Sequence, residues 1–357
     1  MLIVLFIILN CMIRVAINGY GRIGRVAHRV ILEKYSEEID VVAINAGSST
    51  DIKGCMLLLK YDTVYGHLSK DIKCQMSNIK YKDQIGSLVI DSREIPVFSQ
   101  KDPSWLPWKD LNVDVVIEST GHFLTEEKLK THLTAGAKKV VLSAPAKGGE
   151  IATYVLSVND KNYKGESLIN NASCTTNCIT PVAKIMLDHF GIEKAMMTTI
   201  HGFTSDQRLQ DGGHKDYRRA RAATLNIVPT STGATIAAAK ALPALSNIFS
   251  GFAIRVPVPV GSLSDFTFLL KKPTTVDEIN NIFKEEANNP LYKGIIEVTE
   301  DPIVSSDIIG NSHSAIVDLS LTQVVGGNMV KVIAWYDNEY GYANRLVEEV
   351  AMVGKSI

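Results

Sequence analysis

The sequence lacks any strong excess of charge of one sign. Its 37 Lys and Arg residues are balanced by 38 Asp and Glu residues, so the formal net charge of the 357-residue chain is −1. Proteins that bind mainly nucleic acid or anionic membranes usually carry a basic excess, so we expect neither partner. With 46% hydrophobic and 21% charged residues, the chain can bury a sizeable core and does not resemble a disordered protein. Its length predicts about two domains.

Cysteines are few and show no disulfide or metal pattern. The five are Cys11, Cys55, Cys74, Cys174 and Cys178. An odd number without the regular spacing of a secreted framework favours a reducing compartment. Cys174 and Cys178 do not form a CxxC motif, and on a helix they would lie one turn apart on one face. Because no clustered His or Cys residues complete a zinc set, we predict no metal site.

No apolar run approaches the roughly 20 residues that a membrane-spanning helix needs. Residues 1–11 are almost wholly apolar, but the run stops at Met12. A signal peptide would carry a basic n-region and a small-residue cleavage site, and this segment has neither. We interpret residues 1–11 as an N-terminal extension from a mis-assigned start, because residues 13–18 already have the pattern of a first strand. The expectation of a soluble, cytoplasmic protein without a membrane partner depends on that interpretation.

What the sequence does contain is a glycine-rich turn in the right setting for a dinucleotide. The apolar run at residues 13–18 leads into the sequence GYGRIG, a helical pattern follows, and a second apolar run occupies residues 41–45. In such a βαβ unit the glycines permit a tight turn, close approach of the pyrophosphate and close packing of helix on strand. The helix N-terminus then binds the phosphates. The motif predicts these cofactor-binding residues: Gly19, Gly21, Arg22, Ile23 and Gly24.

Further strands and helices alternate in the same style, which predicts a doubly wound α/β sheet. Residues 113–118 and 139–143 have the pattern of buried parallel strands, and a helical segment containing residues 132–137 lies between them. Ligands bind at the carboxyl ends of such strands, where Thr120 and Ser143 fall. We count Lys101 as a further candidate for binding the cofactor.

The end of the second strand departs from the usual fingerprint. An Asp or Glu is expected there, accepting hydrogen bonds from the adenosine ribose and repelling a 2′-phosphate. This chain instead has Ala46, followed by Gly47, Ser48, Ser49 and Thr50. A small residue and several hydroxyl groups would admit a phosphate, which favours NADP. The alternative is that Ala46 is ordinary drift and NAD still binds.

Cys174 and His201 are the candidates for the chemistry. Cys174 falls at the start of a helical pattern, where the helix dipole lowers a thiol pKa. Residues 197–201 form a strand pattern that ends in His201. Each residue alone has a structural explanation, since cysteines are often buried. A Cys–His pair behind a dinucleotide fold instead predicts an activated nucleophile and its base.

Five stretches of the chain carry a family resemblance: INGYGRIGR, KYDTVYGH, NASCTTNC, HKDYRRARAATLNIVPTSTGA and WYDNEYGYANR. With them, the chain resembles the glyceraldehyde-3-phosphate dehydrogenase family from Met12 to the C-terminus. It implies that Cys174 adds to the aldehyde carbon while His201 takes the proton and, with the Cys174 backbone N–H, stabilises the oxygen. Hydride then passes to the nicotinamide, and inorganic phosphate attacks the thioester to release an acyl phosphate, reversibly.

The resemblance also implies the binding residues. Asn338 would fix the nicotinamide carboxamide. Two phosphates must be bound, one on the substrate and one that attacks the thioester. Arginine guanidinium groups and hydroxyl groups are suited to both, since they donate hydrogen bonds to phosphate oxygens. The substrate phosphate is assigned to Thr204 and Arg255, and the attacking phosphate to Ser173, Thr175, Arg219, Thr232 and Gly233.

Two further departures from the family concern loops. The family's loop beside a neighbouring subunit's cofactor is residues 203–225 here, and it has Gly212-Gly213 where many NAD-preferring members have Leu-Pro. This opens the same ribose pocket as Ala46 and also favours NADP. Residues 257–262 read Pro-Val-Pro-Val-Gly-Ser instead of Pro-Thr-Pro-Asn-Val-Ser, a change that we expect to touch no residue assigned to the chemistry.

The expected architecture is α/β: a Rossmann dinucleotide-binding domain and an α+β catalytic domain with a mixed, largely antiparallel sheet. We expect the first domain at 12–173 and 337–357 and the catalytic domain at 174–336. The resemblance implies a homotetramer. Erythrose-4-phosphate dehydrogenase is the nearest alternative, although the Thr232-Gly233 turn favours the triose enzyme. The second alternative is a non-catalytic redox-sensing or nucleic-acid-binding protein with this fold. The presence of all the catalytic and phosphate-binding residues named above argues against it.

Overall fold

The computed structural model describes residues 12–357, so the interpretation of residues 1–11 falls outside the described part of the chain. The protein divides into two compact units. Of the described residues, unit 1 comprises those from Met12 to Thr153, Tyr163–Asn171 and Ala343–Ile357, and unit 2 comprises Tyr154–Asn162 and Ala172–Tyr342. The main segment of unit 2 begins at Ala172, two residues before Cys174. The chain re-enters unit 1 at Ala343, whereas the expected boundary was residue 337. Residues 154–162, expected in the first domain, belong to unit 2.

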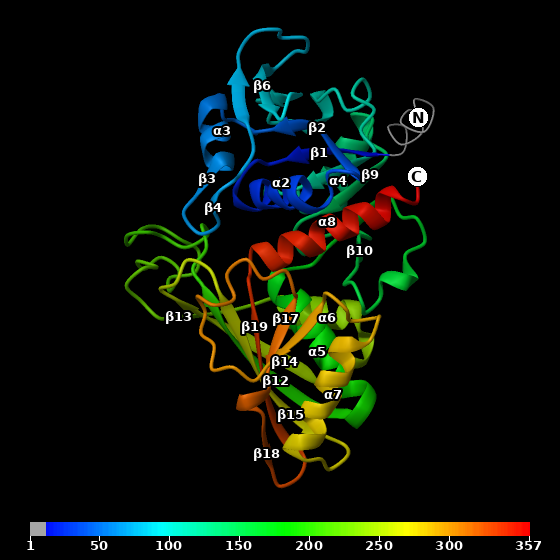
Figure 1. Cartoon of the computed structure of the whole chain (residues 1–357), viewed down its shortest axis with the longest axis vertical. Coiled ribbons are helices and arrows are strands. Elements are labelled where there is room, and N and C mark those ends of the chain that lie inside the picture. Colours follow the sequence, from blue (N-terminus) through cyan, green and yellow to red (C-terminus); the bar gives the residue numbers. More distant parts are fainter. Residues whose placement is uncertain (1–11) are drawn as a thin grey trace. The chain divides into compact units, whose positions relative to one another are not determined.

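Unit 1 is built on a nine-stranded sheet whose strand order is β10-β11-β9-β8-β1-β2-β7-β6-β5. Figure 1 labels β1, β2, β6, β9 and β10 of this sheet. The strands from β10 to β7 pair in parallel, whereas β5, β6 and β7 pair antiparallel. This arrangement confirms the predicted Rossmann fold. The strands are β1 (Ile13–Asn18), β2 (Ile39–Asn45), β5 (Ile72–Gln75), β6 (Gln84–Ile90), β7 (Arg93–Phe98), β8 (Val115–Glu118), β9 (Lys139–Leu142), β10 (Ala152–Thr153) and β11 (Leu168–Asn170).

The helices of unit 1 follow the strands as the βαβ pattern requires. They are α2 (Arg22–Lys34), α3 (Ile52–Lys60) and α4 (Glu126–Thr134), and a short hairpin joins β3 (Tyr61–Asp62) to β4 (Gly66–His67). Helix α4 ends earlier than expected, since Gly136 has a φ of 106°, outside the helical range. The last helix, α8 (Tyr340–Gly354), contacts α2 through a hydrogen bond from Lys34 Nζ to Asn344 Oδ1 at 2.8 Å.

Unit 2 contains a mixed sheet, as predicted. Its order is β13-β14-β12-β15-β19-β17-β16, with β18 paired to β19. Strands β12 and β14 pair in parallel, as do β16 and β17, and the remaining pairs are antiparallel. The strands are β12 (Ile192–Gly202), β13 (Val228–Thr230), β14 (Phe249–Val256), β15 (Ser262–Leu270), β16 (Ile296–Thr299), β17 (Ala315–Asp318), β18 (Gln323–Val325) and β19 (Met329–Tyr336).

Three helices accompany this sheet: α5 (Cys174–Phe190), α6 (Ala234–Ala241) and α7 (Val276–Asn288). Helix α5 carries a buried apolar face that includes Cys178, Val182 and Met186, and these side chains share one core with Phe266 and Phe268 of β15. Burying apolar side chains contributes about 25 cal/mol for each Å² removed from water. The start of α5 is therefore held in place by the core of unit 2.

Candidate functional site

The nucleophile candidate is the first residue of α5. Ser173 caps the helix, and its Oγ accepts a hydrogen bond from the Thr176 backbone N–H at 3.1 Å. Ser173 has extended backbone angles, with φ of −125° and ψ of 166°, as expected for a capping residue. The cap leaves Cys174 in the first turn of the helix, where backbone N–H groups and the positive end of the dipole favour negative charge.

Cys174 and His201 lie together. The Nε2 atom of His201, on β12, is 3.4 Å from Cys174 Sγ. The other ring nitrogen, Nδ1, is 2.7 Å from the Gly202 carbonyl oxygen and 2.7 Å from Arg255 Nη1. Gly202 requires a hydrogen on Nδ1, whereas Arg255 requires a lone pair there. The tautomer with its hydrogen on Nδ1 donates to the Gly202 carbonyl and has a lone pair on Nε2. This tautomer is therefore the one that is able to act as a base toward Cys174.

Burial changes the acidity of both groups. It raises the pKa of the Cys174 thiol, while the Arg255 charge and hydrogen bonds from Thr175 and the backbone act in the opposite direction. Burial also lowers the pKa of His201 to about 3, with a further contribution from Arg255. The expectation of a lowered thiol pKa is therefore wrong, because the helix terminus acts on a desolvated group. His201 stays neutral at physiological pH and is able to accept a proton.

Arg255 is the cation nearest to this pair. It occupies the position on β14 that pairs with His201 on β12. Its Nε is buried and has no hydrogen-bond partner among residues 12–357, and burial lowers the pKa of the guanidinium. A buried guanidinium with an unused donor favours binding of an anion. Thr204 lies in the loop that leaves β12 and is half-buried.

Arg219 is fixed by Thr230 and Ser231 and by Asp206, which the sequence patterns did not single out. Its Nε donates to Thr230 Oγ1 at 2.9 Å, its Nη1 to Asp206 Oδ2 at 2.6 Å, and its Nη2 to the Ser231 carbonyl at 3.0 Å. Two of its five N–H hydrogens thus remain for a ligand. Thr232 and Gly233 immediately precede α6, with Gly233 in the capping position. Asp206 follows the strand that carries His201 but belongs to no recognisable motif.

Tyr336 lies in the stretch WYDNEYGYANR, but the sequence analysis assigned it no role. Its hydroxyl oxygen lies 2.9 Å from Thr175 Oγ1 and 2.8 Å from Thr199 Oγ1, and its ring meets the His201 ring edge-on at 6.0 Å between centroids. Thr175 Oγ1 is in turn 4.0 Å from Cys174 Sγ. A tyrosine at a strand end carries no sequence signal for this role, since only strand pairing brings it beneath the nucleophile.

Asn338 contacts the segment that departs from the family pattern. Its Oδ1 accepts hydrogen bonds from the Gly261 backbone N–H at 3.1 Å and from Ser262 Oγ at 2.9 Å. Residues 257–262 therefore contact a residue assigned to the cofactor, whereas the expectation concerned only the residues assigned to the chemistry. Gly261 has a φ of 96°, and a Cβ there would lie 2.5 Å from the Ser305 carbonyl oxygen. The two contacts fix Asn338 Oδ1 as an acceptor and leave Nδ2 to donate to a ligand.

In unit 1 a cavity of about 410 Å³ lies beside the glycine turn. Gly19 has a φ of 96°, and a Cβ there would lie 2.6 Å from the Thr120 backbone nitrogen. A Cβ on Gly24 would lie 2.2 Å from the Gly19 carbonyl oxygen, so the helix packs closely on the turn. Such a cavity fits part of a dinucleotide. Its lining includes Gly19, Tyr20, Gly21, Arg25, Ala46, Gly47, Ser48, Ser49, Asp51 and Thr120.

The other predicted cofactor residues lie outside this lining. Arg22 forms an ion pair with Asp62, Ile23 and Gly24 are in the first turn of α2, and Lys101 is exposed. Ser143 donates its backbone N–H to the Glu118 carbonyl at 2.9 Å. Glu118 is a further residue that the sequence analysis missed: it is fully buried, and its carboxylate accepts from the Thr120 N–H at 2.8 Å.

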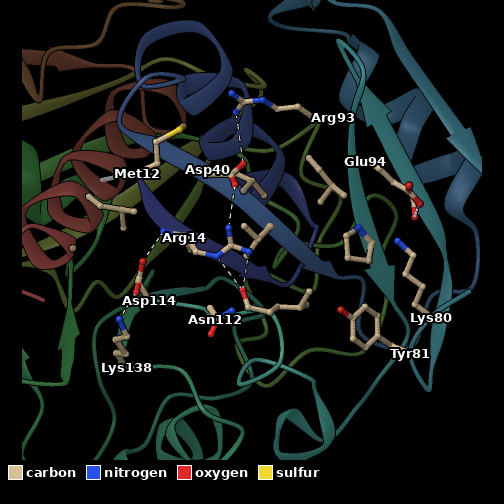
Figure 2. A pocket seen from close by; sticks show the side chains of 18 of the residues that line it. Met12, Arg14, Asp40, Lys80, Tyr81, Arg93, Glu94, Asn112, Asp114 and Lys138 are labelled. Carbon is tan, nitrogen blue, oxygen red and sulfur yellow. Dashed lines mark hydrogen bonds and ion pairs between the residues drawn. The ribbon is translucent and has the colours of Figure 1, made fainter. Parts of the chain in front are cut away.

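A larger cavity of about 840 Å³ lies where β1, β2 and β7 begin, whereas the glycine turn follows the end of β1. Figure 2 shows charged side chains around it. Asp40 pairs with both Arg14 and Arg93 at 3.6 Å, and Asp114 pairs with Lys138 at 2.7 Å. These carboxylates are committed to ion pairs, and among residues 12–357 no cysteine or histidine lines the cavity.

Within residues 12–357, no three His, Cys, Asp or Glu side chains are grouped closely enough to hold a metal ion. In the same range, no helix combines the length and apolar character needed to cross a bilayer.

Residues 13–126 match the family model described as glyceraldehyde 3-phosphate dehydrogenase, NAD binding domain, and residues 173–338 match the C-terminal domain model of that family. The chain is 50% identical over 350 residues to glyceraldehyde-3-phosphate dehydrogenase from Mycobacterium avium, covering 97% of this chain and 99% of the relative. It is 51% identical over 345 residues to the protein of the same name from Thermotoga maritima, covering 96% and 100%.

Proposed function

We propose, because the chain belongs to the glyceraldehyde-3-phosphate dehydrogenase family, that it oxidises glyceraldehyde 3-phosphate to an acyl phosphate with reduction of NAD or NADP. The observation that carries this proposal is the Cys174–His201 pair, with Sγ and Nε2 3.4 Å apart at a helix N-terminus. A thiol and a neutral imidazole at this distance suit nucleophilic attack on a carbonyl carbon.

The first step forms a bond between Cys174 Sγ and the aldehyde carbon. His201 Nε2, which is neutral at physiological pH, takes the thiol proton. The imidazolium and the Cys174 backbone N–H then stabilise the negative charge on the former carbonyl oxygen. A bound nicotinamide dinucleotide supplies the acceptor for the hydride. The resulting thioester to Cys174 is opened by inorganic phosphate, and the thiolate leaves.

We assign the two phosphates to two cationic sites. Arg255 with Thr204 holds the phosphate of the substrate, supported by the unused, buried Nε donor of Arg255. Arg219 holds the attacking phosphate, together with Ser173, Thr175 and the Thr232-Gly233 turn. The hydrogen bonds from Arg219 to Asp206 and Thr230 support this assignment, since they hold the planar guanidinium group in one orientation. Its remaining N–H hydrogens are able to donate to a phosphate.

We further propose that the protein accepts NADP at least as well as NAD. Ala46 and Ser48 both line the cavity beside the glycine turn, so no carboxylate occupies the second-strand position that normally repels a 2′-phosphate. Asp51 also lines the cavity, but its Oδ1 accepts from the Gly54 N–H at 2.8 Å as the cap of α3. This capping role commits Asp51 to the helix rather than to the ribose.

A homotetramer is the proposed assembly. Support comes from large apolar side chains exposed on and near the loop at residues 203–225, because apolar area of this extent usually marks an interface. They include Leu209 at 74%, Tyr217 at 87%, Leu225 at 82% and Ile227 at 71% exposure. Light scattering coupled to gel filtration tests it: a monomeric mass would contradict it. We propose a cytoplasmic location, in keeping with four free thiols among the described cysteines.

The decisive assay follows NADH or NADPH production from glyceraldehyde 3-phosphate with and without inorganic phosphate. The proposal requires turnover that depends on both compounds. Erythrose 4-phosphate serves as the comparison substrate, and a higher kcat/KM for the tetrose would assign the protein to the other phosphorylating dehydrogenase. Absence of aldehyde-dependent reduction with either cofactor would contradict the proposed activity.

A further inference from the structure

A buried carboxylate lies at the carboxyl end of β8, next to the cavity beside the glycine turn. Glu118 is the last residue of the strand and is fully buried. Its Oε1 accepts from the Thr120 backbone N–H at 2.8 Å and from Thr120 Oγ1 at 2.5 Å, and Thr120 lines the cavity. Its Oε2 lies 2.5 Å from Asn18 Nδ2 and 3.1 Å from His132 Nε2. All of these residues belong to unit 1.

The contact with Trp108 fixes the protonation of His132. The indole Nε1–H of Trp108 donates to His132 Nδ1 at 3.1 Å, and both side chains are fully buried. An indole nitrogen is only a donor, so His132 Nδ1 accepts and carries no hydrogen. The hydrogen of the neutral ring is then on Nε2, where it donates to Glu118. An imidazolium would place a second hydrogen on Nδ1, facing the indole N–H. His132 therefore binds Glu118 as a neutral donor and brings no positive charge.

The direction of the Asn18 contact is fixed by the backbone. Asn45 Oδ1 accepts from the Gln100 N–H at 3.0 Å, and Asn45 Nδ2 donates to the Gln100 carbonyl oxygen at 2.8 Å. Asn45 Nδ2 also donates to Asn18 Oδ1 at 2.6 Å, so Asn18 Nδ2 faces Glu118 as a donor. Asn18 Nδ2 is also 3.4 Å from His132 Nε2, but a neutral imidazole accepts at one nitrogen only, and here that nitrogen is Nδ1. Both partners of Glu118 Oε2 are therefore neutral donors.

Glu118 is consequently a buried carboxylate without a cationic partner. Within residues 12–357, the one ion-pair contact of its oxygens is with His132, which is neutral. A buried charge is normally paired, because its removal from water is costly. Four neutral hydrogen bonds hold the carboxylate but leave its charge uncompensated. Such a charge favours a positive charge in a ligand that binds nearby.

The topology of the sheet indicates which part of a dinucleotide lies on this side. Strand β8 is the neighbour of β1 on the side away from β2. In a doubly wound sheet, the dinucleotide crosses the point where the strand order reverses, and the adenosine ribose lies at the end of the second strand, here β2. The end of β8 therefore faces the nicotinamide half. The nicotinamide ring carries a positive charge when oxidised and is neutral when reduced.

We propose that Glu118 makes the dinucleotide site prefer the oxidised cofactor over the reduced one. Its negative charge attracts the pyridinium ring of NAD⁺, and this attraction is absent for the neutral ring of NADH. Trp108 and His132 are positioning residues, since they hold Glu118 by a hydrogen bond and leave its charge unpaired. This inference rests on the proposed function, because the charge difference is that of its hydride acceptor. It assigns the redox preference of the site to residues for which the sequence analysis gave no role.

The test measures the dissociation constants of NAD⁺ and NADH by equilibrium titration in the absence of aldehyde. The readout is the ratio of the NADH constant to the NAD⁺ constant, because a general weakening of the site changes both constants and cancels. In wild type this ratio should exceed one. Glu118→Gln keeps the size of the side chain and removes its charge. The ratio should therefore fall by about fivefold, as expected for the loss of one charge interaction at a high effective dielectric.

Two further variants separate the charge of Glu118 from its place in the fold. Glu118→Asp keeps the charge but shortens the side chain, so it should weaken binding of both cofactor forms and preserve their ratio. A merely structural role predicts that neither Glu118→Gln nor Glu118→Asp changes the ratio. Glu127→Gln is the matched control, because it removes an exposed carboxylate from α4 of the same unit. It should leave both dissociation constants unchanged.

Trp108→Phe provides a second route if Glu118→Gln does not fold. Without the indole N–H, His132 is able to bind a second proton and neutralise Glu118, so the ratio should fall as in Glu118→Gln. The inference is overturned if wild type binds NADH as tightly as NAD⁺, or if both Glu118→Gln and Trp108→Phe keep the wild-type ratio. It is also overturned if Glu127→Gln or Glu118→Asp lowers the ratio as much as Glu118→Gln does.

The outcome stays distinct from that of the proposed function, since the titrations need no turnover. Tighter binding of NAD⁺ that depends on Glu118, without any aldehyde-dependent reduction, would contradict the proposed function and support this inference. Aldehyde-dependent turnover with the same ratio in wild type and Glu118→Gln would contradict this inference alone. Binding of neither NAD⁺ nor NADH by wild type would contradict both.

Discussion

Cys174 Sγ and His201 Nε2 lie 3.4 Å apart, although one atom belongs to the first turn of a helix and the other to a strand 27 residues further along the chain. Cys174 is partly buried and His201 is buried. This burial raises the pKa of the thiol and lowers that of the imidazole to about 3. Both effects favour the uncharged thiol and imidazole. The thiolate therefore forms when His201 accepts the proton during attack on substrate.

Replacing Cys174 with Ser should abolish dehydrogenase activity and leave the affinity for the cofactor nearly unchanged. A hydroxyl group is a far weaker nucleophile than a thiolate at neutral pH. Cys178→Ser is the control, because Cys178 is fully buried, burial raises its thiol pKa far above the ordinary value, and Ser264 Oγ lies 3.9 Å away to pair with a hydroxyl. Steady-state rates and cofactor titration measure both. Substantial turnover in Cys174→Ser would rule out the thioester.

His201→Asn should slow the reaction of Cys174 with iodoacetamide near neutral pH, because the thiol loses the base 3.4 Å away. The effect should be partial, since the N-terminus of α5 and the Arg255 charge still favour the thiolate. The measurement is the labelling rate as a function of pH, which should approach that of an ordinary thiol titration. An unchanged profile would mean that His201 does not activate Cys174.

Ala46→Asp should shift cofactor preference towards NAD. Ala46 lines the cavity beside the glycine turn, and a carboxylate there would accept hydrogen bonds from free ribose hydroxyls, each contributing on the order of 1 kcal/mol. It would also repel a 2′-phosphate a few ångströms away. The ratio of kcat/KM for NAD and NADP in wild type and variant provides the measurement. A wild-type preference for NAD of tenfold or more, roughly 1.4 kcal/mol, would contradict the cofactor proposal.

Unit 1 should lose stability as the pH falls below about 6.5. His28 is fully buried, and burial lowers its pKa to about 3. Its folded-state pKa lies below the unfolded value, so the unfolded chain binds the proton first. The stability it contributes is present above pH 6.5 and is lost as the pH falls towards 3, on the order of 2 kcal/mol between pH 7 and pH 5.

Urea unfolding at pH 7 and pH 5 measures this loss. His28→Asn removes the titrating group, so its stability should change less between the two pH values than that of wild type. His122→Asn, at an exposed position, should keep the wild-type dependence. Equal pH dependence in wild type and His28→Asn would show that His28 does not contribute.

Local patterns were sufficient for the parts of the site that depend on neighbouring residues. The alternation of short apolar runs with helical segments predicted the parallel sheet, and the helical pattern that begins at Cys174 predicted its place at a helix start. Segment ends were less accurate: β8 begins at Val115 rather than 113, and α4 ends at Thr134. The ends of these segments depend on strand pairing and on single residues such as Gly136. The spacing of apolar residues along the chain does not reveal either.

By itself, the sequence determined that a dinucleotide turn precedes a Cys–His site, since hydrophobic spacing, glycine positions and capping act over a few residues. Only the tertiary structure decided what surrounds that site. Asp206 against Arg219, Ser262 against Asn338, and Tyr336 against Thr175 and Thr199 are contacts that strand pairing and loop packing bring about. The direction of the Cys174 pKa shift was likewise settled by burial, because desolvation depends on every residue packed around the thiol and no local pattern encodes it.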